Sequence, residues 1–277
     1  MPKITVLTIT TRNLYLSEQV NSLKSQTLQD FEWVVVDSHC AERPLILAHL
    51  IKGAFSFTHI PDKKPDYYAT SQAFNTGLIY SRGELVFFMS DYILPHPDCL
   101  ARHWEIYKRY KNVMISGRSI RMDCSPLELD TMLNSMGGNI MGKDYRAGIK
   151  QDRTLLEPDL YEVKPTTSLT WWSGRNDSAP LEAMLDCNGF EEEMDGGWGG
   201  QDGEFANRLM TYGLRHLLDR KSMCLKFEHT PGQGKSIRTA EEQLALGISL
   251  VKSKKESGVY TSNLKRSLRE ERKKTIG

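Results

Sequence analysis

Residues 31–37 read FEWVVVD, an apolar and β-branched run that ends in an aspartate. Such a run is typical of a strand that is buried on both faces of a parallel sheet. Similar runs occur at residues 4–10 and 85–89, and stretches with helical spacing of apolar residues lie between them. This alternation predicts an α/β fold with a mostly parallel sheet and helices on both of its faces.

Further elements follow from the same two patterns. Apolar residues three or four positions apart indicate helices, and short β-branched runs indicate strands. Helices are expected at residues 16–23, 44–51, 69–80, 97–110, 180–185, 202–212 and 240–255. Additional strands are expected at residues 54–59, 113–116, 214–218 and 223–227.

The composition is that of an ordinary globular protein, with 39% hydrophobic and 26% charged residues in a chain of 277. It excludes a disordered chain and a disulfide-stabilised miniprotein. No apolar run approaches the ~20 residues of a membrane-spanning helix, and the N-terminal apolar run indicates a strand rather than a secretory signal. The five cysteines are scattered without a CxxC pair. We therefore expect reduced thiols, no structural zinc and a cytoplasmic location.

The net charge of +1 hides an uneven distribution. Residues 252–277 hold nine basic and three acidic residues, a balance of +6, which leaves about −5 on the rest of the chain. This basic segment is predicted either to contact an anionic acceptor or surface, or to be a solvated terminal helix.

Three polar residues stand where predicted strands end, namely Thr10, Asp37 and Asp91. Ligands bind at the carboxyl ends of the strands in sheets of this kind. A carboxylate such as Asp37 can accept hydrogen bonds from a base or a ribose, or it can cap a loop. Asp91 can bind a divalent cation, and the cation can bind a diphosphate.

A glycine-rich segment, GGWGGQDGE at residues 196–204, is the most unusual stretch of the chain. Glycines let a backbone approach a ligand closely, and Trp198 offers an apolar face that suits a sugar ring. Asp202 stands where the next helix begins. It can cap that helix, or it can point into a cleft as a general base.

Two aromatic stretches are further candidates. The sequence FEH at residues 227–229 follows a predicted strand, and His229 is either a surface histidine or, with Asp91, a ligand of Mn²⁺ or Mg²⁺. Adjacent tryptophans at 171 and 172 lie in a β-prone run, where neighbouring side chains face opposite sides. One of them is expected in the core and the other at a cleft.

Together these residues resemble a family 2 glycosyltransferase of the GT-A fold. The resemblance is carried by VLTITTRN at 6–13, SLKSQTLQDFEWVVVDS at 22–38, NTG at 75–77 and GE at 83–84. It implies a nucleotide-sugar site made of Thr10, Arg12, Asp37, Asn75, Ser90 and Asp91. In this site Asp37 is expected to bind the nucleotide's base, uracil or its equivalent. The family's DxD metal motif is incomplete, because Ser90 stands beside the single acid Asp91.

The C-terminal half resembles the galactosyltransferase and chondroitin-polymerase branch, through NGFEE at 188–192 and WGGQD at 198–202. This resemblance implies Asp202 as the catalytic base and His229 with Asp91 as metal ligands. It implies an acceptor site made of Trp172, Trp198, Gly199, Gly200 and Gln201. Gln201 replaces a glutamate that is usually linked to acceptor binding.

The resemblance implies a GT-A domain over residues 1–235, followed by a helical basic tail over residues 236–277. The nucleotide-sugar half is expected at about 1–118 and a fused acceptor-side lobe at about 165–235. The expected activity is inverting transfer of a hexosyl or N-acetylhexosaminyl group from a nucleoside-diphosphate sugar, with UDP as the expected nucleotide and Mn²⁺ or Mg²⁺ as cofactor. The acceptor is a hydroxyl of a carbohydrate or another molecule. Two other classes stay open, a nucleotidyltransferase and a catalytically inactive nucleotide- or sugar-binding protein.

Overall fold

The computed structural model describes residues 1–12, 15–38, 43–62, 66–128, 159–163, 172–228, 235–263 and 265–276. Helices and strands alternate through most of this chain, as the apolar patterns predict. In chain order the elements are β1 (Ile4–Thr10), α1 (Leu16–Lys24), β2 (Phe31–Asp37), α2 (Arg43–Ile51), β3 (Ser56–Pro61), α3 (Thr70–Tyr80), β4 (Leu85–Phe88), β5 (Ile93–Pro95), α4 (Cys99–Tyr110), β6 (Val113–Arg121), β7 (Leu160–Val163), β8 (Asp177–Pro180), α6 (Leu181–Asp186), the 3₁₀ helix η3 (Glu192–Met194), α7 (Gln201–Tyr212), β9 (Arg215–Lys226), α8 (Ala240–Ser257) and α9 (Leu268–Ile276).

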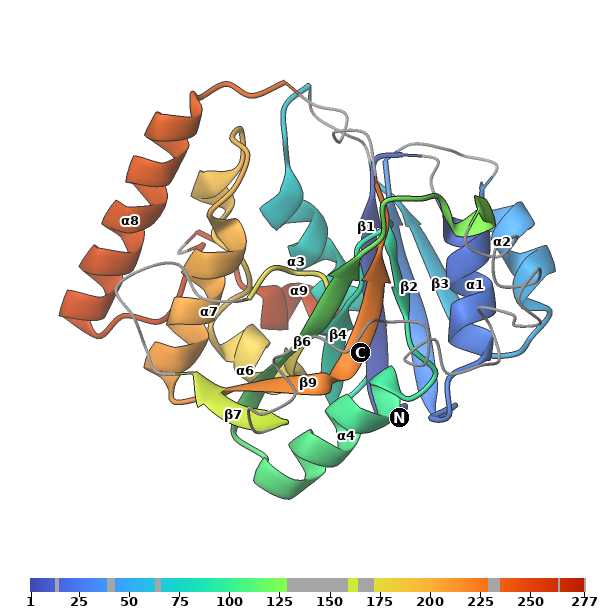
Figure 1. The fold of residues 1–277 in the computed structure, drawn as a ribbon. Coiled ribbons are helices and arrows are strands. Elements are labelled where there is room, and N and C mark those ends of the chain that lie inside the picture. The colour runs from blue at the N-terminus through green and yellow to red at the C-terminus, as the bar shows by residue number, and fades with distance from the viewer. Residues whose placement is uncertain are drawn as a thin grey trace.

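The strands of the described residues form one nine-stranded sheet in the order β3-β2-β1-β4-β8-β6-β9-β5, with β7 paired to β9. The first four strands of this order are parallel to one another. β8 is antiparallel to both of its neighbours, and β6 and β9 are again parallel. Strands from the predicted nucleotide half and the predicted acceptor half therefore share a single sheet (Figure 1).

The sheet has a hydrophobic core on each face, which explains the uninterrupted apolar strands. Successive side chains of a strand point to opposite faces. In β2, Val34 and Val36 pack in the core with residues of α3, α6 and α7, whereas Trp33 and Val35 pack in the other core with residues of α1, α2 and α4. Figure 1 shows α1 and α2 on one side of the sheet and α3, α6 and α7 on the other.

The structure differs from the predicted strands in two places. The two short strands expected at 214–218 and 223–227 are one strand, β9, whose pairing with β6 shifts register after Gly117. The sequence reasoning missed β8, whose residues Asp-Ser-Ala-Pro lack the β-branched signal of a strand. It forms because β4 and β6 pair with it from both sides. The β-prone run that holds the adjacent tryptophans lies outside the described part of the chain up to residue 171, so the place of Trp171 stays a prediction.

The C-terminal segment is part of the folded body and not a free tail. Leu268 of α9 is fully buried in the core that α3 and α6 line. Arg269 pairs with Asp186, and Lys254 of α8 pairs with Glu191 and Glu204. Because these cations already have carboxylate partners in the body, their charge is largely neutralised. α9 is therefore anchored to the body at its N-terminal end by Leu268 and Arg269, and a role in binding an anionic surface has no support in these contacts.

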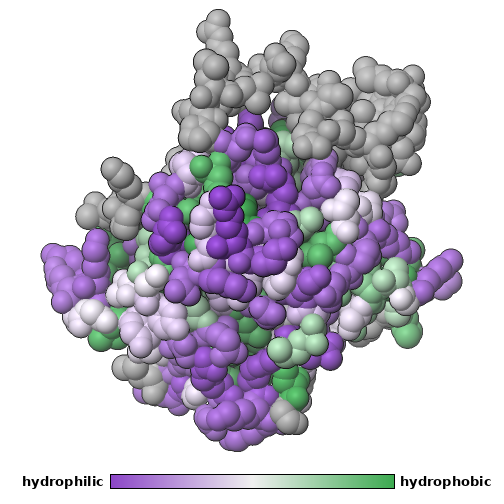
Figure 2. Space-filling model, turned by 90° about the horizontal axis from the view of Figure 1, so that it is seen from below, coloured by the Kyte–Doolittle hydropathy of each residue, from purple (hydrophilic) through white to green (hydrophobic). Residues whose placement is uncertain are grey.

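The surface is polar on the face that Figure 2 shows, with hydrophobic residues scattered singly or in small groups over its coloured part. Scattered apolar residues are normal for a folded chain in water. None of the helices in the described residues is both long and apolar enough to span a bilayer. The cysteines of the same residues are free thiols at positions 99, 124, 187 and 224.

Candidate active site

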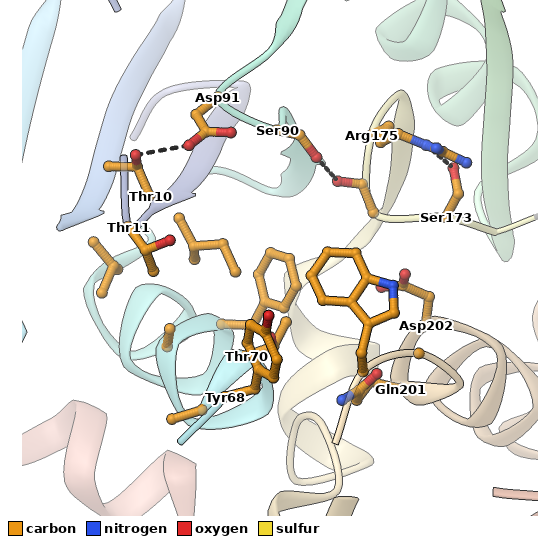
Figure 3. Close-up of a pocket in the computed structure, with 18 of the residues that line it drawn as sticks. Thr10, Thr11, Tyr68, Thr70, Ser90, Asp91, Ser173, Arg175, Gln201 and Asp202 are labelled. Carbon is orange, nitrogen blue, oxygen red and sulfur yellow. Dashed lines mark hydrogen bonds between the residues drawn. The ribbon is translucent and has the colours of Figure 1, made fainter. Parts of the chain in front are cut away.

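A cavity of about 500 Å³ opens at the carboxyl ends of β1 and β4, where the sheet meets the glycine-rich segment. It is lined by ten of the predicted site residues, namely Thr10, Arg12, Ser90, Asp91, Trp172, Trp198, Gly199, Gly200, Gln201 and Asp202. In Figure 3, Asp91 and Ser90 lie on one side of the cavity, Tyr68 and Gln201 lie opposite, and Asp202 closes one end. Residues far apart in the sequence thus meet in one place, as the strand ends predict.

Asp91 is held by two residues that follow or end β1. The Nη2 of Arg12 donates to Oδ1 of Asp91 at 2.7 Å, and its Nε donates to Oδ2 at 3.1 Å. The hydroxyl of Thr10 donates to the same Oδ2 at 2.8 Å. The Asp91 side chain is only 1% exposed, so this is a buried bidentate ion pair. Removing one partner from such a pair typically costs about 3–5 kcal/mol, because a buried charge is left uncompensated.

These contacts do not fit the predicted divalent cation at Asp91. Both carboxylate oxygens already accept hydrogen bonds from a cation or a hydroxyl, and a guanidinium stands where an ion would bind. Ser90 directs its hydroxyl to the carbonyl of Gly174 at 3.1 Å. No three His, Cys, Asp or Glu side chains of the described chain gather in an arrangement that can hold a metal. His229, the second predicted ligand, lies outside the described residues.

Asp202 is the second residue of α7 and belongs to the cavity wall. It is not the N-cap of this helix, because Gly200 occupies the N-cap position. Burial raises the pKa of Asp202 to about 7; the charge of Asp177 adds to this rise, and Arg175 opposes it. A carboxyl group with this pKa is well matched to remove a proton near neutral pH.

Gly174 makes room for the Asp202 carboxylate. A Cβ atom at Gly174 would lie 2.9 Å from Oδ1 of Asp202, and Gly174 has the left-handed φ of +63° that favours glycine. The next residue, Arg175, lines the cavity, and its Nε donates to the hydroxyl of Ser173 at 3.1 Å (Figure 3). The segment 173–175 therefore connects Ser90 on one wall with Asp202 on the other.

The neighbouring carboxylates are engaged elsewhere. Glu204 is fully buried against Arg208, which donates to it from Nε at 2.7 Å and from Nη2 at 2.9 Å. Glu192 accepts hydrogen bonds from Arg266 and from the side chain of Asn75. Glu191 pairs with Lys254. None of the three is among the described residues that line the cavity, whereas Asp202 is.

The glycine-rich segment is anchored from two helices. Asp195, just before it, accepts hydrogen bonds from the backbone N–H groups of Ser71 and Gln72 and so caps the N-terminus of α3. Gln243 of α8 donates to the carbonyls of Met194 at 2.9 Å and Gly199 at 3.1 Å. These bonds fix the backbone that carries the predicted acceptor residues.

The predicted acceptor residues differ in what they offer a ligand. Trp198 is 60% exposed at the cavity and contacts Tyr68 edge to face, with ring centroids 5.5 Å apart. Trp172 is a core residue that packs against Phe88, and it reaches the cavity wall with one edge. The amide nitrogen of Gln201 donates to the carbonyl of Gly197 at 2.9 Å, so it stabilises the loop.

Two predicted donor residues do not lie on the cavity wall. Asp37 ends β2 between two lining residues, and its Oδ2 lies 3.0 Å from Nε2 of His59. Asn75 is the other one, and its side chain is fully buried. Its amide nitrogen donates to the carbonyl of Phe190 at 3.0 Å and its oxygen accepts from the N–H of Phe190 at 2.7 Å, so it ties α3 to the turn at 188–192.

The sequence of this chain also matches the model of a known family. The family is described as glycosyl transferase family 2, and the match runs over residues 5–155, more than half of the 277 residues. The chain belongs to glycosyl transferase family 2. No curated protein sequence matches the chain significantly.

Solved structures with a similar fold include proteins from two organisms. S. aureus TarS 1–349 in complex with UDP-GlcNAc matches with a TM-score of 0.66 at 12% identity, over 97% of this chain and 69% of that one. The mannosyltransferase PcManGT from Pyrobaculum calidifontis, in complex with GDP-Man and Mn²⁺, matches with a TM-score of 0.57 at 17% identity, over 84% of this chain and 59% of that one. The family 2 chain spans 39% of a longer S. aureus TarS structure, which it matches with a TM-score of 0.64 at 13% identity over 91% of its own length. The predicted α/β GT-A fold is confirmed.

Proposed function

We propose that this chain transfers a hexosyl or N-acetylhexosaminyl group from a nucleoside-diphosphate sugar to an acceptor hydroxyl, with inversion at the anomeric carbon. One observation carries the proposal: a carboxyl group with a pKa of about 7, that of Asp202, lies in the same cavity as the carboxyl ends of β1 and β4. Membership of glycosyl transferase family 2 supports the reaction class. The release of a nucleoside diphosphate from a nucleotide sugar tests it.

In the proposed reaction the Asp202 carboxylate takes the proton of the acceptor hydroxyl. The hydroxyl oxygen forms a bond to the anomeric carbon while the bond between that carbon and the diphosphate oxygen breaks. The nucleoside diphosphate leaves with the bonding electrons. General-base catalysis of this kind contributes typically about 10²–10⁴-fold to the rate. Because attack and departure occur on opposite faces of the carbon, a single displacement inverts its configuration.

The donor is proposed to occupy the β1 and β4 side of the cavity, with its base toward the end of β2. Asp37 and Thr10 are at strand ends there, which is where α/β sheets bind nucleotides. A TarS structure contains UDP-GlcNAc, which makes UDP the first nucleotide to test. No step of the proposed reaction passes through a divalent cation, because the contacts of Asp91 do not fit one.

The acceptor is proposed to lie on the side of Trp198, as the resemblance to the galactosyltransferase and chondroitin-polymerase branch implies. Trp198 and Tyr68 form an exposed aromatic corner at the cavity. Aromatic side chains offer a large apolar face, on which the apolar face of a sugar ring can stack. A carbohydrate is therefore the acceptor class that this corner suits best.

The replacement Asp37→Ala is expected to weaken UDP binding tenfold or more. A hydrogen bond to a charged group is worth about 1.5–3 kcal/mol, and the imidazole of His59 already holds the Asp37 carboxylate in place. Isothermal titration calorimetry with UDP measures the effect. Asp30→Ala, at an exposed carboxylate before β2, is the matched control and is expected to bind UDP normally. Unchanged affinity in Asp37→Ala would remove Asp37 from the site.

A further inference from the structure

Two cations near the cavity have no carboxylate partner among the described residues. The guanidinium of Arg175 donates to the hydroxyl of Ser173, a neutral group, at 3.1 Å. The ammonium of Lys226, at the end of β9, lies over the ring of Tyr92, 5.9 Å from its centroid. Burial, followed by the positive charges of Arg175 and Arg121, lowers the pKa of Lys226. Arg175 and Lys226 therefore repel each other, although Asp202 attracts Arg175 and Glu228 attracts Lys226, and a bound anion would relieve that repulsion.

These two cations border the place where the donor is proposed to bind. Tyr92 and Arg175 both line the cavity. Arg12 also lies over the Tyr92 ring, with Cζ 5.3 Å from the centroid, so Arg12 and Lys226 share one aromatic neighbour. Figure 3 shows Arg175 on the same side of the cavity as Ser90 and Asp91. The positive charges of Arg175 and Lys226 thus lie at the β4 end of the cavity.

Two other cations of this region are paired with carboxylates. Arg12 neutralises Asp91 in the bidentate pair described above. Arg121 pairs with Glu228, a carboxylate that also attracts Lys226. A nucleoside diphosphate carries at least two negative charges. Arg175 and Lys226, which make no ion pair among the described residues, supply two positive charges that can bind it.

We propose that Arg175 and Lys226 bind the diphosphate of the donor, and that the chain holds a nucleoside diphosphate without a divalent cation. This inference rests on the proposed function, since it concerns the donor side of the same site. Arginine binds phosphate oxygens through paired N–H donors, and lysine binds them as a point charge. In this arrangement Arg12 is the permanent counter-ion of Asp91, and the two remaining cations supply the charge that a metal ion otherwise provides.

Calorimetry with UDP and GDP tests this inference, each titrated once with EDTA and once with Mn²⁺. We expect one of the two nucleotides to bind in EDTA with an affinity within threefold of that in Mn²⁺. Lys226→Met and Arg175→Gln are each expected to weaken binding of that nucleoside diphosphate tenfold or more and to leave binding of the bare nucleoside unchanged. Thermal unfolding followed by circular dichroism confirms that both variants are folded.

The matched control is Lys221→Met, on the same strand, because Lys221 is half exposed and pairs with Asp159 away from the cavity. It is expected to bind like the unmodified chain. Binding that appears only with Mn²⁺, or normal nucleotide affinity in folded Lys226→Met and Arg175→Gln, would overturn the inference while leaving the proposed function intact. Absence of binding to both nucleotides under both conditions would overturn the proposed function, and this inference with it.

Discussion

The replacement Asp202→Asn is expected to reduce kcat at least a hundredfold while UDP binding persists. Asparagine keeps the size and the hydrogen bonding of the side chain, but it cannot take up a proton. Asp202 lies in the cavity wall at the start of α7, apart from the strand ends that are proposed to bind the nucleotide. The loss therefore falls on the chemical step rather than on donor binding, and steady-state kinetics with calorimetry separates the two.

The pH dependence gives a second readout of the same residue. The base must be a carboxylate, and burial raises the pKa of Asp202 to about 7. Below that pH the group is protonated, so kcat is expected to fall about tenfold per pH unit; above it, kcat reaches a plateau. In Asp202→Asn the residual kcat is expected not to show this fall at low pH.

Glu192→Gln is the matched control for Asp202→Asn, because Glu192 is tied to Arg266 and Asn75 outside the cavity. It is expected to retain most of the activity. Near-normal turnover in Asp202→Asn, combined with a loss in Glu192→Gln, would place the base elsewhere. Normal turnover in both would contradict the single-displacement mechanism.

Without residues 259–277 the chain is expected to be largely unfolded at room temperature, so that no cooperative unfolding transition is seen on heating. The truncation deletes α9, whose Leu268 is fully buried and whose Arg269 binds Asp186, and with it Arg266, which precedes α9 and binds Glu192. It also uncovers part of the core that α3 and α6 line. Deleting one buried leucine side chain alone costs about 2–5 kcal/mol, against a typical total stability of about 5–15 kcal/mol. Circular dichroism during heating measures the result.

Leu268→Ala is the milder form of the same test and is expected to lower the free energy of unfolding by about 2–5 kcal/mol. Ile276→Ala on the same helix is its control, because Ile276 is exposed and its loss is expected to cost about 0.5 kcal/mol or less. A truncated chain that melts like the full chain would show that α9 is dispensable, as a free tail would be.

The sheet and its ligand-binding edge were predictable, because they depend on local patterns. The run at 31–37 and its counterparts are apolar without interruption, and only a sheet covered on both faces buries such strands completely. Thr10 and Asp91 follow from this, since the ends of neighbouring parallel strands meet at one edge. Their direct hydrogen bond in the structure is the consequence of that geometry.

The roles of several residues were not predictable, because they depend on tertiary contacts. Asn75 matches a family motif, but its side chain is used by the turn at 188–192, which lies more than a hundred positions away. Arg175 was not among the predicted site residues, and its place in the cavity depends on the left-handed turn at Gly174. The basic composition after residue 252 indicated a solvated helix, whereas its arginines have partners that no local pattern reveals.

The central claim is that the chain is a nucleotide-sugar glycosyltransferase, and product analysis tests it most directly. The unmodified chain is incubated with UDP-, GDP- and dTDP-sugars and a panel of carbohydrate acceptors, and the nucleotide released is identified by chromatography. The account predicts a nucleoside diphosphate in equal amount to a glycosylated acceptor, and loss of both products in Asp202→Asn. Release of pyrophosphate, or binding of the nucleotide sugars without any turnover across the panel, would contradict it.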